Sequence, residues 1–379
     1  MTGLRNLRPV HVIGGGLHRY QPASDTPYVT IALAAVRQAV EDAGIAWPDV
    51  DSAYVGTCLL GSAPGRVILR HMGGSGLAIT HIENASASGS SAFRQACMDV
   101  ASGFSDVSIA LGVDKHAPFN NAQTKTGVTE LAASEIVPFT HFALLANEYM
   151  TRHGVTAEHI ARVAVKNHRN GSLNPYAHRQ QARSIDEIMD GPVSGILTRL
   201  QCCPVGDGAA AVIVASKEAM ERLGIDQNRA VRVTASAARS ERLYGPGEGF
   251  DEHLTRETVA LALQEAGRLI DEVDVIELHD AFTIEELLYL EAIGLVPSGH
   301  AAGALVDGAF DIGGTCAVSP SGGLLSMGHP IGPTGVGQVV ETVRQLRGEA
   351  GSRQQPGAKV GLVHMVGVGS VCVAHVLER

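Results

Sequence analysis

A single histidine, His329, stands in a stretch of glycine and proline that precedes an expected helix over residues 336–347. Glycine permits backbone conformations closed to other residues and proline stiffens the turn, so residues 319–335 should form a rigid loop. A histidine held beside a helix N-terminus is placed to transfer a proton or to bind an oxyanion. A glycine-rich turn with an incidental histidine is the other interpretation of so short a motif.

A serine-rich loop at residues 84–91 has the same relation to an expected helix over residues 90–103. The backbone N–H groups and the dipole of a helix N-terminus stabilise an anion, so this loop suits a nucleophile or an oxyanion. Serine is also a preferred helix cap. Ser90 or Ser91 can serve as the cap, and we expect Ser86 to face the site.

Other polar residues are candidates for the same site. His279 and Asp280 end a buried strand, the position at which α/β sheets form ligand sites, although a capping Asp280 with a satisfied histidine is also consistent. His141 is a weaker candidate for acid/base work. A group of basic residues can form a patch for an anionic ligand or a solvated face, and it comprises Lys166, His168, Arg169 and Arg179.

The elements that must position these residues occur twice. A helix over residues 28–43 and a strand over 50–56 correspond to a helix and strand within 258–280. The Ser86 and His329 loops correspond in the same way, each followed by a helix and a strand. Two matches in the same order indicate an internal duplication. We therefore expect an α/β protein with two halves, residues 1–228 and 229–379, each a mostly parallel or mixed sheet covered by helices.

Two local features refine this organisation. Residues 115–195 break the symmetry, and we interpret them as an insertion that covers the active-site face. Gly14–Gly16 follow a first expected strand over residues 9–14. A loop, rather than a helix, is expected after these glycines, which argues against a Rossmann phosphate loop.

Composition excludes several classes of protein. The formal charge of −10 argues against a nucleic-acid partner, and 45% apolar residues suffice for a large core. The six cysteines lack the spacing of metal ligands, so we expect reduced thiols and no metal site. Neither a signal peptide nor an apolar run of about 18 residues is present, which predicts a cytoplasmic protein without a membrane span.

Taken together, these motifs resemble the thiolases, and within them the sterol-carrier-protein-x or lipid-transfer branch. Matching segments occur in family order along nearly the whole chain, at residues 84–92, 167–176, 200–211, 279–287, 320–324, 328–335 and 364–369. The resemblance implies a five-layer αβαβα fold that is at least dimeric. It also implies action on acyl-CoA thioesters without a permanent cofactor, and in some relatives a small OB-fold, zinc-ribbon partner subunit.

The resemblance also implies roles for particular residues. His329 and His279 are similar to the activating and oxyanion-binding histidines of the family, and Gly89 and Gly367 belong to the loops around the oxyanion. Coenzyme A would contact the side chains of Ser321, Lys166, His168 and Arg169.

Three positions depart from the family pattern. Ser86 occupies the position of the nucleophilic cysteine, and Ala281 and Met365 occupy the positions of the acid/base cysteine. A serine hydroxyl is much less acidic than a thiol and needs a base in contact.

Three hypotheses follow. The first is a thiolase that cleaves or forms a 3-oxoacyl-CoA, in which Ser86 is natural or an engineered replacement and His279 or His141 supplies the further acid/base. The second is retro-aldol cleavage of a 3-hydroxyacyl-CoA, which needs a base and an oxyanion hole but no nucleophile. The third is a non-catalytic subunit that binds acyl-CoA or a partner. Acyl transfer needs a nucleophile, aldol cleavage only a base, and binding neither.

Overall fold

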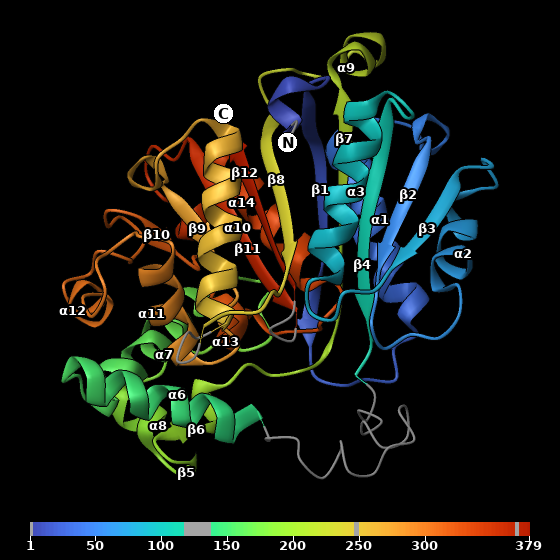
Figure 1. Ribbon diagram of the computed structural model, residues 1–379. Coiled ribbons are helices and arrows are strands. Elements are labelled where there is room, and N and C mark those ends of the chain that lie inside the picture. The colour runs from blue at the N-terminus through green and yellow to red at the C-terminus, as the bar shows by residue number, and fades with distance from the viewer. Residues whose placement is uncertain (1–2, 117–137, 246–249, 368–370) are drawn as a thin grey trace.

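The computed structural model describes residues 3–116, 138–245, 250–367 and 371–379 (Figure 1). Ten strands form one mixed sheet in the order β10-β9-β11-β12-β8-β1-β7-β4-β2-β3, and a small second sheet pairs β5 (Pro192–Ser194) with β6 (Leu197–Thr198). Within the described ranges, no helix has the length and apolar character needed to cross a membrane.

The large sheet consists of two similar five-stranded halves. The first comprises β1 (Val10–Gln21), β7 (Asp207–Ser216), β4 (Val107–Asp114), β2 (Ser52–Gly56) and β3 (Ala78–Ile82). The second comprises β8 (Val231–Ser240), β12 (Val371–Glu378), β11 (Val360–Gly367), β9 (Val275–Glu277) and β10 (Ala317–Val318). Outward from the centre, each half has two antiparallel and then two parallel pairings. This repeated order confirms the duplication, and the halves join where β1 pairs with β8.

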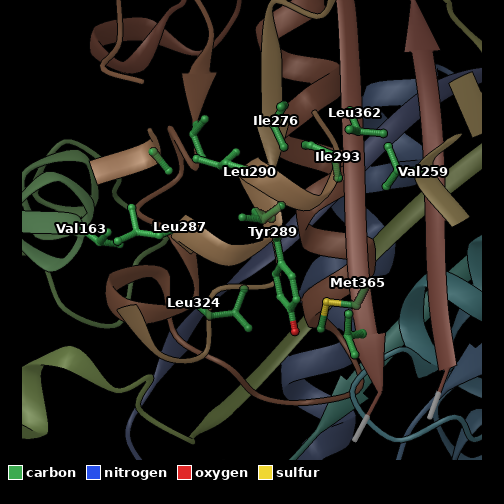
Figure 2. Close-up of a cluster of buried hydrophobic side chains, with 14 of the residues drawn as sticks. Val163, Val259, Ile276, Leu287, Tyr289, Leu290, Ile293, Leu324, Leu362 and Met365 are labelled. Carbon is green, nitrogen blue, oxygen red and sulfur yellow. The ribbon is translucent and has the colours of Figure 1, made fainter. Parts of the chain in front are cut away.

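Helices cover both halves of the sheet, and two of them also pack between the halves. One core cluster packs α1 (Tyr28–Ala43) on the first half, and a second packs α3 (Ser88–Ser102) and α14 (Thr334–Arg347) between strands of both halves. The third places α10 (Phe250–Ala266) and α11 (Thr283–Ala292) against the second half, and Figure 2 shows its side chains, including Val259, Ile276 and Leu362. The result is the expected five-layer αβαβα arrangement.

The insertion forms a small helical region beside α11 (Figure 1). It contains α6 (Pro138–His153), α7 (Ala157–Ser172) and α8 (Ile185–Met189), and α7 packs on α11 and on α13 (Gly323–Met327). Residues 117–137 of the expected insertion lie outside the described residues. The other α-helices in the described ranges are α2 (Pro64–Leu69), α9 (Lys217–Leu223) and α12 (Ala301–Val306).

The first strand differs from the prediction. β1 continues to Gln21, so the loop expected after Gly16 is wrong. A Cβ atom at Gly14 would lie 2.3 Å from the carbonyl oxygen of Ala39, and one at Gly16 would lie 2.1 Å from that of Ala35. Both glycines therefore sit inside the strand because α1 approaches the sheet too closely for a side chain.

Candidate active site

The N-termini of α3 and α14 meet between the two halves, and a glycine in the first turn of each makes this approach possible. A Cβ atom at Gly89 would lie 2.3 Å from the carbonyl oxygen of Gly332, and one at Gly335 would lie 2.2 Å from Ser90 Oγ. The loops that precede the helices are thereby held side by side, and the positive ends of both helix dipoles point into one region. This contact accounts for the place of Gly89 in the serine-rich loop.

Three side chains form a hydrogen-bonded chain across this junction. Ser86 Oγ lies 3.0 Å from His329 Nε2, and His329 Nδ1 lies 2.9 Å from Thr334 Oγ1. The backbone N–H of His329 donates to the carbonyl oxygen of Pro204 at 2.9 Å, which fixes the loop from a third direction. The two loops thus bring Ser86 into contact with His329, and a serine nucleophile needs such a group in contact to accept its proton.

The protonation of His329 suits a general base. Its side chain is buried, and burial, with a smaller contribution from His279, lowers the pKa of His329 well below its usual range. The rings of His279 and His329 are 5.6 Å apart at 83°. A neutral imidazole can accept the Ser86 proton at Nε2 if Nδ1 carries the ring proton and donates it to Thr334.

Both loops contain a strained residue within two positions of the candidate functional one. Ala85 has φ of 47° and Ile331 has φ of 29°, a region that residues other than glycine rarely adopt. Such strain persists only where the surrounding structure holds the backbone firmly in that conformation, and it is common at functional sites. The Glu83 carboxylate accepts the N–H of Ala85 at 2.8 Å.

Asp114 supports the His329 loop from the opposite half and was missed by the sequence reasoning. Its buried carboxylate accepts the N–H of Gly332 at 2.7 Å, that of Leu59 at 2.9 Å and the hydroxyl of Thr57 at 2.7 Å. Burial raises the pKa of Asp114, and these donors oppose that rise. A signal was available, because Asp114 ends a buried strand as the His279 segment does.

His279 lies beside His329 with both ring nitrogens free of hydrogen bonds to the described residues. Its Nδ1 is 3.3 Å from Glu285 Oε1, close enough for an ion pair but without hydrogen-bond geometry. The backbone N–H of His279 approaches His364 Nδ1 at 3.5 Å, and burial lowers the pKa of His364 to about 3. The His279 ring is therefore able to donate to a ligand.

The structure also shows the surroundings of three further residues that the sequence singled out, Gly367, Ser321 and His141. Gly367 ends β11, and a Cβ atom there would lie 2.4 Å from the carbonyl oxygen of Asn84, so this glycine lets the strand reach the Ser86 loop. Ser321 is buried and donates to Glu277 Oε2 at 2.7 Å. His141 is half-buried on α6, and its ring contacts that of Phe142 edge-on.

The expected basic patch is wrong, because its residues do not share a surface. Arg179 is half-buried and donates to the carbonyl oxygens of Cys202 and Leu325. Lys166 is buried and forms an ion pair with Glu286 at 3.0 Å. His168 is also buried, which lowers its pKa to about 4. Arg169 alone is exposed, and it pairs with Asp311.

Cys58 is a thiol close to the Ser86 loop. Its Sγ donates to the carbonyl oxygen of Ala85 at 2.9 Å and lies 3.1 Å from Ser88 Oγ. Burial raises the pKa of the Cys58 thiol to about 12, so it stays protonated and acts as a donor that holds the loop.

Comparison with known proteins identifies the family. Residues 18–188 match the thiolase N-terminal domain, and residues 250–379 match the thiolase C-terminal domain-like family. The chain is 37% identical to the benzoylsuccinyl-CoA thiolase subunit BbsB of Thauera aromatica, covering 96% of this chain and 95% of that protein. It is 36% identical to sterol carrier protein 2 of Homo sapiens, covering 97% of this chain and 71% of that one.

A solved structure of the Ltp2-ChsH2(DUF35) aldolase has the same fold, with a TM-score of 0.82 over 98% of each chain at 22% identity. The fold, the paired helix N-termini and the matches in both halves agree. The chain belongs to the thiolase family, in the branch that contains sterol carrier protein 2.

Proposed function

We propose that this protein makes or breaks a carbon–carbon bond beside an acyl-CoA thioester, with Ser86 in the position of the family's nucleophile. The observation that carries the proposal is the 3.0 Å contact between Ser86 Oγ and Nε2 of His329, whose pKa is lowered by burial. In cleavage of a 3-oxoacyl-CoA, Ser86 Oγ attacks the 3-keto carbon and its proton passes to His329 Nε2. The C2–C3 bond then breaks, and its electron pair becomes the enolate of the departing acyl-CoA.

His279 supports the rest of this reaction. Its ring, which makes no hydrogen bond to the described residues, lies beside His329, where it can donate to the oxygen of the enolate. A proton from an imidazolium completes the departing acyl-CoA, and the thiol of free coenzyme A releases the acyl group from Ser86. Thioesters of coenzyme A are thus the substrates in either direction.

A second candidate is retro-aldol cleavage of a 3-hydroxyacyl-CoA. Here His329 removes the proton of the 3-hydroxyl group, the C2–C3 bond breaks, and no acyl-enzyme forms. The presence of Ser86, Ala281 and Met365 where the family has cysteines favours this candidate. A non-catalytic subunit is the weakest candidate, because mere binding does not require His279 and His329 to be held side by side.

We also propose that the protein is an oligomer, at least a dimer, and that it is located in the cytoplasm. The oligomer is supported by β3, an edge strand with largely exposed residues that another copy can pair with. The aldolase with the same fold is named for two proteins, Ltp2 and the DUF35 protein ChsH2. A small partner subunit of the OB-fold, zinc-ribbon kind is therefore worth testing for this chain.

The test compares the natural chain with Ser86→Cys and Ser86→Ala. Each protein is incubated with acetyl-CoA and with a short 3-oxoacyl-CoA, intact mass reports acyl adducts, and release of coenzyme A reports turnover. Acylation of the natural chain or of Ser86→Cys, with none in Ser86→Ala, supports acyl transfer at this position. If none of the three is acylated although thioester binds, acyl transfer is wrong and 3-hydroxyacyl-CoA cleavage is tested next.

A further inference from the structure

A small cavity adjoins the His329 loop and is lined in part by Gly328 and Thr334. Its volume is about 10 Å³, and its lining includes Thr334, Gln338, Glu277, Tyr20 and Glu341. This is close to the smallest volume that admits one water molecule. A water is stable in such a space only if two or more polar groups face it, and the lining meets that condition.

Gln338 lines this space and has an unsatisfied buried oxygen. Its side chain is buried, with 4% exposed, and its Nε2 donates to the carbonyl oxygen of Leu278 at 3.0 Å. That bond fixes the orientation of the amide, because the opposite one would bring two oxygens together. Oε1 then has no hydrogen-bond partner among the described residues. An unpaired buried oxygen costs about 1–3 kcal/mol, so a donor in the cavity is strongly favoured.

Thr334 connects the cavity to the base. When His329 Nδ1 carries the ring proton, it donates to Thr334 Oγ1 at 2.9 Å. The Thr334 hydroxyl must then donate to another acceptor, and the cavity that Thr334 lines is the place for one. The direction of this hydroxyl therefore decides which nitrogen of His329 is protonated.

Glu277 supplies a charge that can set this direction. It is buried, and its two oxygens accept the N–H of Ser321 at 3.0 Å and the Ser321 hydroxyl at 2.7 Å. Burial, and then the charge of Glu341 on α14, raise the pKa of Glu277 to about 8. The other ionisable groups facing it are Lys166 on α7, Tyr20 on β1 and Asp280 on its own segment.

We propose that the cavity binds one water molecule that links Thr334 to Gln338 and Glu277, and that Glu277 is thereby a positioning residue for His329. The water accepts from Thr334 and donates to Gln338 Oε1 and to the ionised Glu277. All the donors then point away from His329, which keeps its proton on Nδ1 and leaves Nε2 free to act as the base. The inference rests on the proposed function only for the role of Nε2.

Protonation of Glu277 reverses the chain. The acid then donates to the water, the water donates to Thr334, and the Thr334 hydroxyl donates to His329 Nδ1. The ring stays neutral, because its proton moves from Nδ1 to Nε2 by exchange with solvent. Nε2 can then no longer accept the Ser86 proton.

The first experiment measures the tautomer directly and needs no turnover. Protein labelled with 15N-histidine is titrated by NMR from pH 6.5 to pH 9, and the His329 signals are assigned by their loss in His329→Ala. We expect the Nδ1–H form at high pH, conversion to the Nε2–H form near the pKa of Glu277, and no such conversion in Glu277→Gln. A tautomer that is constant over this range in the natural chain, or titrates equally in Glu277→Gln, would overturn the inference.

Tyr20→Phe is the matched control. Tyr20 lines the same cavity, but its hydroxyl donates to the carbonyl oxygen of Pro333 and takes no part in the chain. The tautomer titration should remain in Tyr20→Phe, and its loss there would count against Glu277 as the cause. Thermal unfolding of both variants checks that they are folded.

A crystal structure at high resolution tests the water itself. Density within hydrogen-bond distance of Thr334 Oγ1, Gln338 Oε1 and Glu277 is expected, and a dry cavity would contradict the proposal. Once a substrate is found, kcat/KM of Glu277→Gln at pH 9 should be about tenfold lower than that of the natural chain, a modest part of the effect of a general base. Failure to find a substrate refutes the proposed function but leaves the NMR and crystallographic results valid.

Discussion

The loops before α3 and α14 occupy equivalent places in the two halves, yet they have become different parts of one site. Each precedes a helix and contains a non-glycine residue with positive φ, Ala85 in the first and Ile331 in the second; the first loop follows β3, whereas the second follows the short helix α13. The first presents Ser86 half-buried, whereas the second buries His329. Duplication therefore supplies two helix N-termini in contact, and divergence has placed a serine before one and a histidine before the other.

The two loops also differ in the hydrogen bonds that hold them in place. The Ser86 loop is held largely by its own residues, since Ser88 Oγ donates to the carbonyl oxygen of Ala85 at 2.6 Å and accepts the N–H of Asn84 at 2.8 Å. The His329 loop is held by Asp114 and Pro204 of the opposite half, and the His329 ring by Thr334 of its own half. These contacts from separate segments fix the position of the His329 ring.

The largest effect should come from removing the base. His329→Ala is expected to lower kcat by about 10³-fold or more, because general-base catalysis and the activation of Ser86 are lost together. Steady-state kinetics checks this, and circular dichroism confirms folding. The parallel variant Ser86→Ala sharpens the comparison: acyl transfer predicts an equal loss, and aldol cleavage predicts that most activity remains. Full activity of His329→Ala would refute the site.

An intermediate effect should come from the glycines that bring the loops together. Gly89→Ala places a methyl group against the carbonyl oxygen of Gly332. Because backbone must move to admit it, we expect a loss of about 2–3 kcal/mol in the free energy of unfolding, measured by denaturant titration. Gly335→Ala should behave similarly.

Gly303→Ala on α12 is the control for these glycines. A Cβ atom at Gly303 meets nothing within 4 Å, so alanine there should be neutral or stabilise by up to about 1 kcal/mol. If Gly89→Ala proves as stable as Gly303→Ala, the two helix N-termini are not in the contact described.

The smallest effect concerns a buried histidine outside the loops. His375 on β12 packs against Phe93 of α3, and burial lowers its pKa to about 3. The unfolded chain takes up a proton at this residue below about pH 6.5 whereas the folded chain does not, so stability falls as pH falls. Between pH 7 and pH 5 this residue alone should cost about 2 kcal/mol.

The change His375→Gln should remove this part of the acid sensitivity in denaturant titrations at the two pH values. His71→Gln, at an exposed position, is the control and should leave the pH dependence as in the natural chain. An unchanged dependence in His375→Gln would show that His375 is protonated in the folded protein.

Much of the architecture was predictable because its signals are local. Apolar spacing located α1 at Tyr28–Ala43, and Gly44, with φ of 67°, ends it as expected. The repeated helix–strand units indicated the duplicated topology. Both site loops were recognisable from glycine, proline and serine ahead of a helix. The extension of β1 through Gly14–Gly16 was not, because its cause is the approach of α1 to the sheet.

The amino-acid sequence by itself determined the class of fold, the duplication and the two loops with Ser86 and His329, because each depends on residue types at short spacing. Only the tertiary structure decided which polar groups are buried and what they face. Lys166 forms an internal ion pair instead of a surface cation, Asp114 holds the His329 loop, and Thr334 holds the His329 ring. Burial and long-range hydrogen bonds depend on segments far apart in the chain, so no local pattern could assign them.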